Sequence, residues 1–104
     1  MKRVIEGKRY DTETADCVAD ISPRRYANDA SNFHWEDTYL YRTKKGAWFI
    51  AGKGHAASRW ATACGNGYGP GYGLKVVTAE DARLLLEQYG TVEDVEQYFT
   101  VEDA

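Results

Sequence analysis

The sequence predicts an α+β fold: an antiparallel sheet of about four or five strands with two or three helices packed mainly on one face. Aromatic and β-branched residues alternate between Trp35 and Ala51, which is typical of a strand pair. Apolar residues recur at helical spacing between Ala82 and Tyr89. Strands and helices do not alternate along the chain as they do in βαβ folds. With 104 residues, the chain is expected to form a single domain over residues 1–104.

The first twenty residues predict a hairpin followed by a helix. Residues 4–11 flank Gly7, a residue suited to a tight turn. Asp11, or the threonine after it, can then accept a hydrogen bond from the free amides of a first helical turn. We therefore expect a helix over residues 12–20 with a narrow apolar stripe, followed by an exposed loop over residues 22–32.

The central hairpin is expected to be the structural heart of the domain. Its two strands are predicted over residues 35–43 and 47–51, joined by a Lys-Lys-Gly turn. Because side chains alternate along a strand, the first of these strands has an aromatic face and a mixed face. Either both faces are partly covered, or the aromatic face is left for a partner. The aromatic face comprises Phe33, Trp35, Asp37, Tyr39 and Tyr41.

Residues 52–73 have the least regular pattern in the chain. Small residues around Trp60 predict about two helical turns over residues 56–63, with Gly65 as the C-terminal stop. Glycine then occupies every second position over residues 65–73, which predicts a mobile loop. Residues 74–77 are predicted to form a strand that returns to the sheet.

The last quarter of the chain predicts two helices. Thr78, with an acidic residue three positions later, has the pattern of an N-terminal cap, and Gly90 ends this first helix. Thr91 repeats the start signal for a second, shorter helix, and a further TVED at the very end is expected to fray. We expect Trp48 and Phe49 of the central hairpin to face the first helix.

Charge is divided unevenly along the chain, whose formal net charge is -3. Residues 1–78 carry 12 basic and 8 acidic residues, whereas residues 79–104 carry Arg83 against 8 acids, a formal charge of -7. Two interpretations stay open: acids that stabilise helix starts and keep this end solvated, or a negative surface that docks on a basic, nucleic-acid-binding protein. The residues predicted to contact such a partner are Glu87, Glu93, Asp94 and Glu96 from the helices and Trp35, Glu36, Asp37 and Tyr39 from the central hairpin.

No stretch has the residue types and spacing of a catalytic, metal or cofactor site. Residues 52–57 match G-x-G-x-x-A, but the dinucleotide fingerprint works within a parallel βαβ unit. The cysteines and histidines lack the close pairing of structural zinc sites. Glu36 and Asp37 are neighbours in a strand and point to opposite faces, so they cannot flank one bond. The sequence therefore predicts no catalytic residue, no metal and no cofactor.

A nucleic-acid-binding accessory or regulatory protein is the alternative function class. Basic residues interleave with aromatic ones in the first half of the chain, a combination that can bind nucleic acid. The acidic net charge favours a solvated surface, so direct nucleic-acid binding is the lesser interpretation. The candidate residues are Arg24, Arg25, Arg42, Lys44 and Lys45.

The cytoplasm is the expected location. The longest apolar run, residues 47–51, is far shorter than the roughly 20 residues that cross a bilayer, so no membrane segment is predicted. The charged N-terminus lacks the apolar region of a signal peptide. Cys17 and Cys64 are therefore expected to be reduced.

Three segments resemble a family of small proteins carried by phages and other bacterial mobile elements. They are GKRYDTETA at residues 7–15, YLYRTKKGAWF at residues 39–49, with GKG at residues 52–54 shortly after it, and VVTAEDA at residues 76–82. Small acidic proteins in this setting resemble anti-CRISPR inhibitors. The resemblance implies a non-enzymatic protein that binds a subunit of a CRISPR effector complex and blocks DNA binding or cleavage in a bacterial host.

Overall fold

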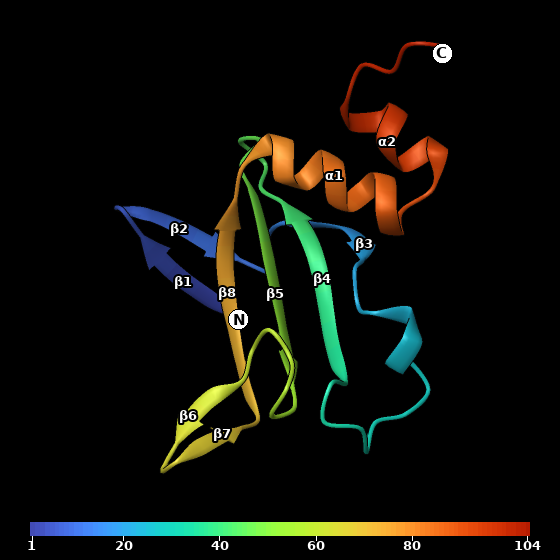
Figure 1. Cartoon of the computed structure of the whole chain (residues 1–104). Coiled ribbons are helices and arrows are strands. Elements are labelled where there is room, and N and C mark those ends of the chain that lie inside the picture. The colour runs from blue at the N-terminus through green and yellow to red at the C-terminus, as the bar shows by residue number, and fades with distance from the viewer.

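A four-stranded antiparallel sheet, in the order β3-β4-β5-β8, is the centre of the protein in the computed structural model, which describes residues 1–104 (Figure 1). Two short hairpins, β1-β2 and β6-β7, extend from the sheet, and two helices follow its last strand. The predicted α+β fold is therefore confirmed. The elements are β1 (Lys2–Ile5), β2 (Lys8–Asp11), β3 (Asp16–Asp20), a 3-10 turn (Arg24–Tyr26), β4 (Glu36–Arg42), β5 (Trp48–Gly54), β6 (Thr62–Cys64), β7 (Gly67–Gly69), β8 (Gly71–Val77), α1 (Ala79–Tyr89) and α2 (Val92–Tyr98).

The predicted central hairpin is confirmed as β4 and β5. The two strands pair without interruption from Glu36 opposite Gly54 to Arg42 opposite Trp48. Gly46 lies in the connecting turn with a φ of 91°, a conformation that glycine adopts without a Cβ clash. β5 lies between β4 and β8, and its first four residues, 48–51, are all buried, so it contributes to the core on both faces of the sheet.

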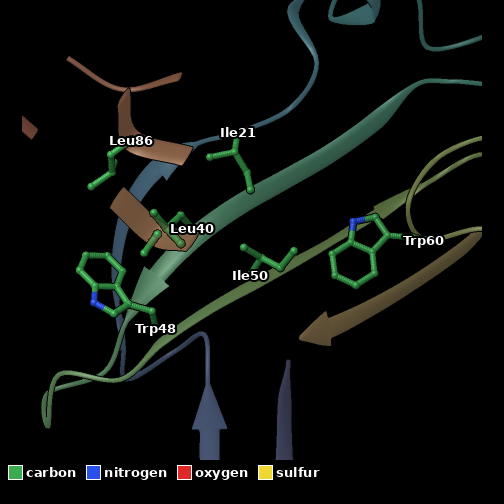
Figure 2. Close-up of a cluster of buried hydrophobic side chains, with 7 residues drawn as sticks. Ile21, Leu40, Trp48, Ile50, Trp60 and Leu86 are labelled. Carbon is green, nitrogen blue, oxygen red and sulfur yellow. The ribbon is translucent and has the colours of Figure 1, made fainter. Parts of the chain in front are cut away.

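One face of the sheet packs against the helices and holds the larger apolar cluster. Leu40 and Ile50, from adjacent strands, lie between Trp48 at one end and Trp60 at the other (Figure 2). Leu86 of α1 packs against the same cluster and is fully buried. Each large apolar side chain buried in this way contributes about 1.5–3 kcal/mol. The helices therefore pack on one face, as predicted.

The opposite face carries a smaller cluster, and it corrects the expectation for Phe49. Trp48 faces the helices, but Phe49 points the other way because successive residues of a strand alternate between faces. The Phe49 ring stacks on Tyr41, with centroids 5.1 Å apart, and meets Tyr10 of the β1-β2 hairpin edge-on at 5.7 Å. The predicted N-terminal hairpin thus exists and covers part of this face.

Both predicted C-terminal helices are confirmed, with their start signals. The Thr78 hydroxyl accepts a hydrogen bond from the Asp81 backbone at 3.1 Å. At α2 the capping box is complete: Thr91 accepts from the Asp94 N–H at 3.1 Å, and the Asp94 carboxylate accepts from the Thr91 N–H at 3.0 Å. The last residues, 100–104, belong to neither helix. Neither helix has the length and apolar content to span a membrane.

The helix predicted over residues 12–20 is wrong, because this segment forms a turn followed by β3. Asp11 does accept local hydrogen bonds, from the Glu13 N–H at 2.9 Å and from the Ala15 N–H at 3.0 Å. The turn does not continue because the next residues pair with β4, with Cys17 opposite Tyr41. This pairing satisfies the free backbone groups of β4, and that tertiary gain outweighs a weak local helix propensity.

The helical turns predicted over residues 56–63 and the mobile loop predicted over residues 65–73 are also wrong. Ser58 and Ala61 donate backbone hydrogen bonds that close single turns, and no helix follows them. Strands β6 and β7 then form a hairpin around Gly65, whose φ is 59°. From Gly71 onward the chain belongs to β8 and pairs with β5.

Paired glycines explain why this region is a sheet. Gly52 lies opposite Gly73, and Gly54 lies opposite Gly71, so the helix-side face has no side chains at these four adjacent positions. Trp60 packs there: a Cβ on Gly73 would lie 3.0 Å from the Trp60 ring, and a Cβ on Gly71 would overlap the Trp60 carbonyl. The glycines are therefore needed for close approach within strands and not for flexibility in a loop.

Candidate functional site

The face of the sheet opposite the helices carries an open groove that follows from the strand register. Ala51 of β5 lies between Tyr39 of β4 and Leu74 of β8, and its small side chain leaves a hollow between larger neighbours. The groove has a volume of about 720 Å³, within the range of about 300–1,000 Å³ that is usual for ligand sites. This aromatic groove is lined chiefly by Trp35, Asp37, Tyr39, Tyr41, Lys53, His55 and Tyr72.

Several rings of the aromatic groove are held by contacts with their neighbours. Trp35 lies against His55 with ring centroids 5.2 Å apart, and Tyr41 stacks on Phe49 with an interplanar angle of 10°. The Nε2 atom of His55 lies 2.6 Å from the carbonyl oxygen of Ala30. Because these contacts restrict ring motion, a ligand meets aromatic surface that is largely formed in advance, and it loses less entropy on binding.

Asp37 and Lys53 lie opposite each other on β4 and β5 and bring charge to the groove. A hydrogen bond to Asp37, followed by burial and by the charges of Asp37 and Asp20, raises the pKa of Tyr39 from 10.0 to about 12. The Tyr39 phenol is therefore protonated at neutral pH and is available to donate to the Asp37 carboxylate. Lys53 is exposed and forms no salt bridge.

The predicted hairpin contacts divide into two groups. Trp35, Asp37 and Tyr39 lie together in the aromatic groove, in agreement with the predicted aromatic face. Glu36 points to the other face and is buried, with its carboxylate 2.5 Å from the Arg59 Nε atom. Glu36 therefore has an internal partner and lies on no partner-facing surface, which corrects its inclusion among the predicted contacts.

The four predicted acidic contacts on the helices lie on the other side of the sheet from the groove. Glu87 pairs with Arg83 at 2.7 Å, and Asp94 is engaged in the capping box. Glu93 and Glu96 are exposed and form no salt bridge. We refer to the exposed acids of the two helices as the acidic end, which comprises Glu80, Asp81, Glu87, Glu93 and Glu96.

Four of the five cations considered for nucleic-acid binding make contacts within the chain. Arg24 donates to the carbonyl oxygen of Tyr89 at 2.9 Å, and Lys44 pairs with Asp16 at 2.7 Å. Arg42 lies over two aromatic rings, at 5.7 and 5.6 Å from their centroids, and Arg25 lies over the Tyr26 ring at 5.7 Å. Only the Lys44–Asp16 pair neutralises a charge, so it alone directly offsets the attraction of this set of residues for phosphate.

Two residues of the aromatic groove, Lys53 and Tyr72, were not among the predicted contacts. Tyr72 was assigned to a mobile loop, although it lies in β8 and 79% of its surface is exposed. Lys53 lies beyond the predicted end of its strand, yet β5 continues to Gly54. The period-2 alternation of glycine with larger residues from Gly71 onward is the signal that could have indicated a strand here.

The cysteines and acidic residues do not gather into a metal-binding group. Cys17 and Cys64 are both free and exposed. Burial, followed by the charge of Asp20, raises the pKa of Cys17, while a hydrogen bond with Tyr41 opposes this change. No three His, Cys, Asp or Glu side chains lie together in a position to hold a metal ion.

Comparison with known proteins gives no match. No family model, curated protein or solved structure is similar to this chain. The resemblance to proteins of phages and mobile elements therefore stays a prediction. The chemistry of the aromatic groove and of the acidic end is the starting point for its function.

Proposed function

We propose that the protein is a non-enzymatic inhibitor carried by a phage or another mobile element. In the manner of the anti-CRISPR proteins it resembles, it binds a CRISPR effector subunit in the cytoplasm of a bacterial host and blocks DNA binding or cleavage. The acidic end carries the proposal, since residues 79–104 have a formal charge of -7. CRISPR effectors hold nucleic acid in positively charged channels, which are complementary to such a surface.

The exposed acids of α2 suit contact with a basic surface. Glu93 and Glu96 are three residues apart, so they lie on the same side of the helix. Neither is paired with a cation of its own chain. A partner cation therefore does not need to displace an internal ion pair in order to bind them.

The acidic end is also held firmly against the sheet. A seven-residue helix such as α2 is marginal in isolation, so it depends on its cap and on packing. The Trp48 ring meets Tyr98 edge-on at 5.3 Å and stacks on Phe99 at 5.5 Å. These contacts fix the orientation of α2 before binding, which lowers the entropy lost when a partner docks.

Phage or plasmid challenge of hosts with active CRISPR systems tests the inhibition, and affinity capture from the same hosts tests the partner. We expect protection of the invading DNA and recovery of an effector subunit. Glu96→Lys should weaken binding about 10-fold or more because like charges then meet at the interface. Glu13→Lys is the matched control, since Glu13 is exposed in the turn before β3 and undergoes the same change of charge.

Two results would contradict these expectations at different levels. If no host in the panel is protected and no effector subunit is captured, the inhibitor proposal is wrong. If protection is seen but Glu93→Lys and Glu96→Lys both bind as tightly as the unmodified protein, the acidic end is not the contact. The contact would then lie on the aromatic face, where Trp35 and Tyr39 are the next residues to replace.

A further inference from the structure

A second hollow lies beside the aromatic groove, at the edge of β8. Its volume is about 240 Å³. The larger side chains that line this hollow are basic and aromatic, and no carboxylate is among its lining residues. Lys75 lies 5.5 Å from the centroid of the Trp60 ring. We call this second hollow the cationic hollow. It is lined chiefly by Arg3, Arg59, Trp60, Thr62, Tyr72 and Lys75.

The aromatic groove and the cationic hollow meet at Tyr72, which lines both. β8 is an edge strand, so the two form a path from the open face of the sheet around its margin. Thr62, which lines the cationic hollow, belongs to β6. The β6-β7 hairpin projects from the end of the sheet away from α2 (Figure 1). The path therefore lies apart from the acidic end.

The charge along this path is opposite in sign to that of the whole protein. The Arg59 guanidinium is balanced by buried Glu36, so it is set aside. Three uncompensated positive charges then remain against a single lining carboxylate, Asp37: Lys53, Lys75 beside the Trp60 ring, and Arg3, which donates to the uncharged Leu74 carbonyl oxygen at 3.0 Å. The net charge of the chain is -3, so the cations of the path are a local concentration of positive charge.

We infer that the aromatic groove and the cationic hollow together bind single-stranded nucleic acid. Exposed rings next to basic side chains are the two parts that such binding requires: bases stack on the rings and phosphates pair with the cations. Tyr72, at the junction of the two hollows, is the most exposed ring and is placed to stack on a base. Lys53 lies opposite Tyr72 on the groove face, and Lys75 lies around the edge of the sheet, on the helix-side face beside Trp60. The two lysines are therefore placed to meet phosphates at different points of the path.

A duplex fits this path poorly because its bases are already stacked on one another and are not free to lie on protein rings. A cationic peptide fits poorly as well, since it would meet Arg3, Lys53 and Lys75 as like charges. Charge and ring exposure together therefore favour a single strand over either competitor. The inference does not depend on the proposed inhibition, because it needs no effector protein and no residue of the acidic end.

Fluorescence anisotropy with the full chain and labelled 12-nucleotide single strands, one RNA and one DNA, tests the inference directly. At 50 mM salt we expect binding of single strands in preference to a duplex of the same length. Three phosphate contacts predict that log affinity falls with log salt concentration with a slope of about -2, since each contact to a single strand adds about 0.7. Quenching of intrinsic tryptophan and tyrosine fluorescence should accompany the binding.

Matched variants assign the binding to the path. Tyr72→Ala should lower the affinity about 5- to 150-fold, the effect of losing one base-aromatic stack. Tyr68→Ala is the control, since Tyr68 is 70% exposed and lines neither hollow. Lys53→Gln should reduce the salt slope by about 0.7, whereas Lys45→Gln, outside both hollows, should not. All four side chains are exposed, so these variants should fold normally.

Three outcomes would overturn the inference. One is the absence of single-strand binding at 50 mM salt. Another is an equal loss of affinity in Tyr72→Ala and Tyr68→Ala. The third is tight binding of an arginine-rich peptide by the unmodified protein when neither oligonucleotide competes with it. None of these outcomes bears on CRISPR inhibition, so the two proposals fail separately.

Discussion

Replacement of Glu36 is the sharpest test of how the sheet is held to the segment around Trp60. Only 4% of the Glu36 side chain is exposed. Its carboxylate accepts from the Arg59 Nε atom at 2.5 Å, from the Thr38 hydroxyl at 2.9 Å and from the Arg59 backbone N–H at 3.3 Å. The Thr38 hydroxyl in turn accepts from the indole N–H of Trp60 at 2.8 Å. Loss of the carboxylate therefore disturbs a chain of contacts between β4 and the loop that precedes β6.

The expected cost follows from what is left without a partner. Removing one member of a buried ion pair typically costs about 3–5 kcal/mol. Because the Arg59 side chain is 28% exposed and can still reach water, we expect Glu36→Ala to cost about 3 kcal/mol, at the lower end of that range. Glu36→Gln keeps the shape and one acceptor oxygen but loses the charge, so we expect a cost of about 2 kcal/mol.

Urea unfolding followed by tryptophan fluorescence measures these costs. With a dependence on urea of about 1–3 kcal/mol per molar, a loss of about 2 kcal/mol moves the midpoint by roughly 1 M. Glu13→Gln, an exposed change of the same kind, should stay within about 0.5 kcal/mol of the unmodified protein. Glu36→Gln supplies the measurement even where Glu36→Ala does not fold.

A small effect would refute the reasoning. If the midpoint of Glu36→Gln lies within the range of Glu13→Gln, the carboxylate is solvated and the ion pair does not hold the fold. A double replacement gives an independent check. Glu36→Leu with Arg59→Met should be more stable than either single variant, because no charge is then left unpaired.

Three further predictions test other parts of the structure. Thr91→Ala should cost about 1 kcal/mol by removing the capping box of α2, measured by urea unfolding together with the loss of helical circular dichroism. Asp37→Asn should bring the pKa of Tyr39 down from about 12 toward 10.0 in an ultraviolet titration, and an unchanged titration would exclude Asp37 as the cause of the raised pKa. Because the folded pKa is the higher one, the stability that Tyr39 contributes is present below pH 10 and is lost as pH rises through about 12. Trp60→Phe should cost about 1–3 kcal/mol, since the Thr38 hydroxyl loses the indole donor, and stability equal to that of the unmodified protein would exclude this bond as a stabilising contact.

The parts of the fold that could be predicted are those with strong local signals. The capping threonines, Thr78 and Thr91, and the apolar spacing of α1 locate both helices within a residue or two. The aromatic alternation through β4 and the residue before it likewise assigns Trp35, Asp37 and Tyr39 to one face. These features depend on neighbours in the chain, so the order of residues is enough to reveal them.

The parts that could not be predicted depend on contacts between distant segments. The residues of β3 were predicted to be helical because Asp11 starts a turn, and such a turn can precede either a helix or a strand. Only pairing with the free edge of β4 selects the strand. Glu36 was expected at the surface because an isolated carboxylate is usually solvated. Its partner, Arg59, is 23 residues away, and no local pattern predicts that they meet.

The sequence by itself determined the helix ends, the central hairpin, the α+β class and the acidity of the last quarter of the chain. Each of these is set by neighbouring residues or by composition. Only the tertiary structure decided that paired glycines seat Trp60 on one face and that Ala51 leaves a groove among rings on the other. Strand register decides both, because it sets which side chains of separate strands lie next to each other.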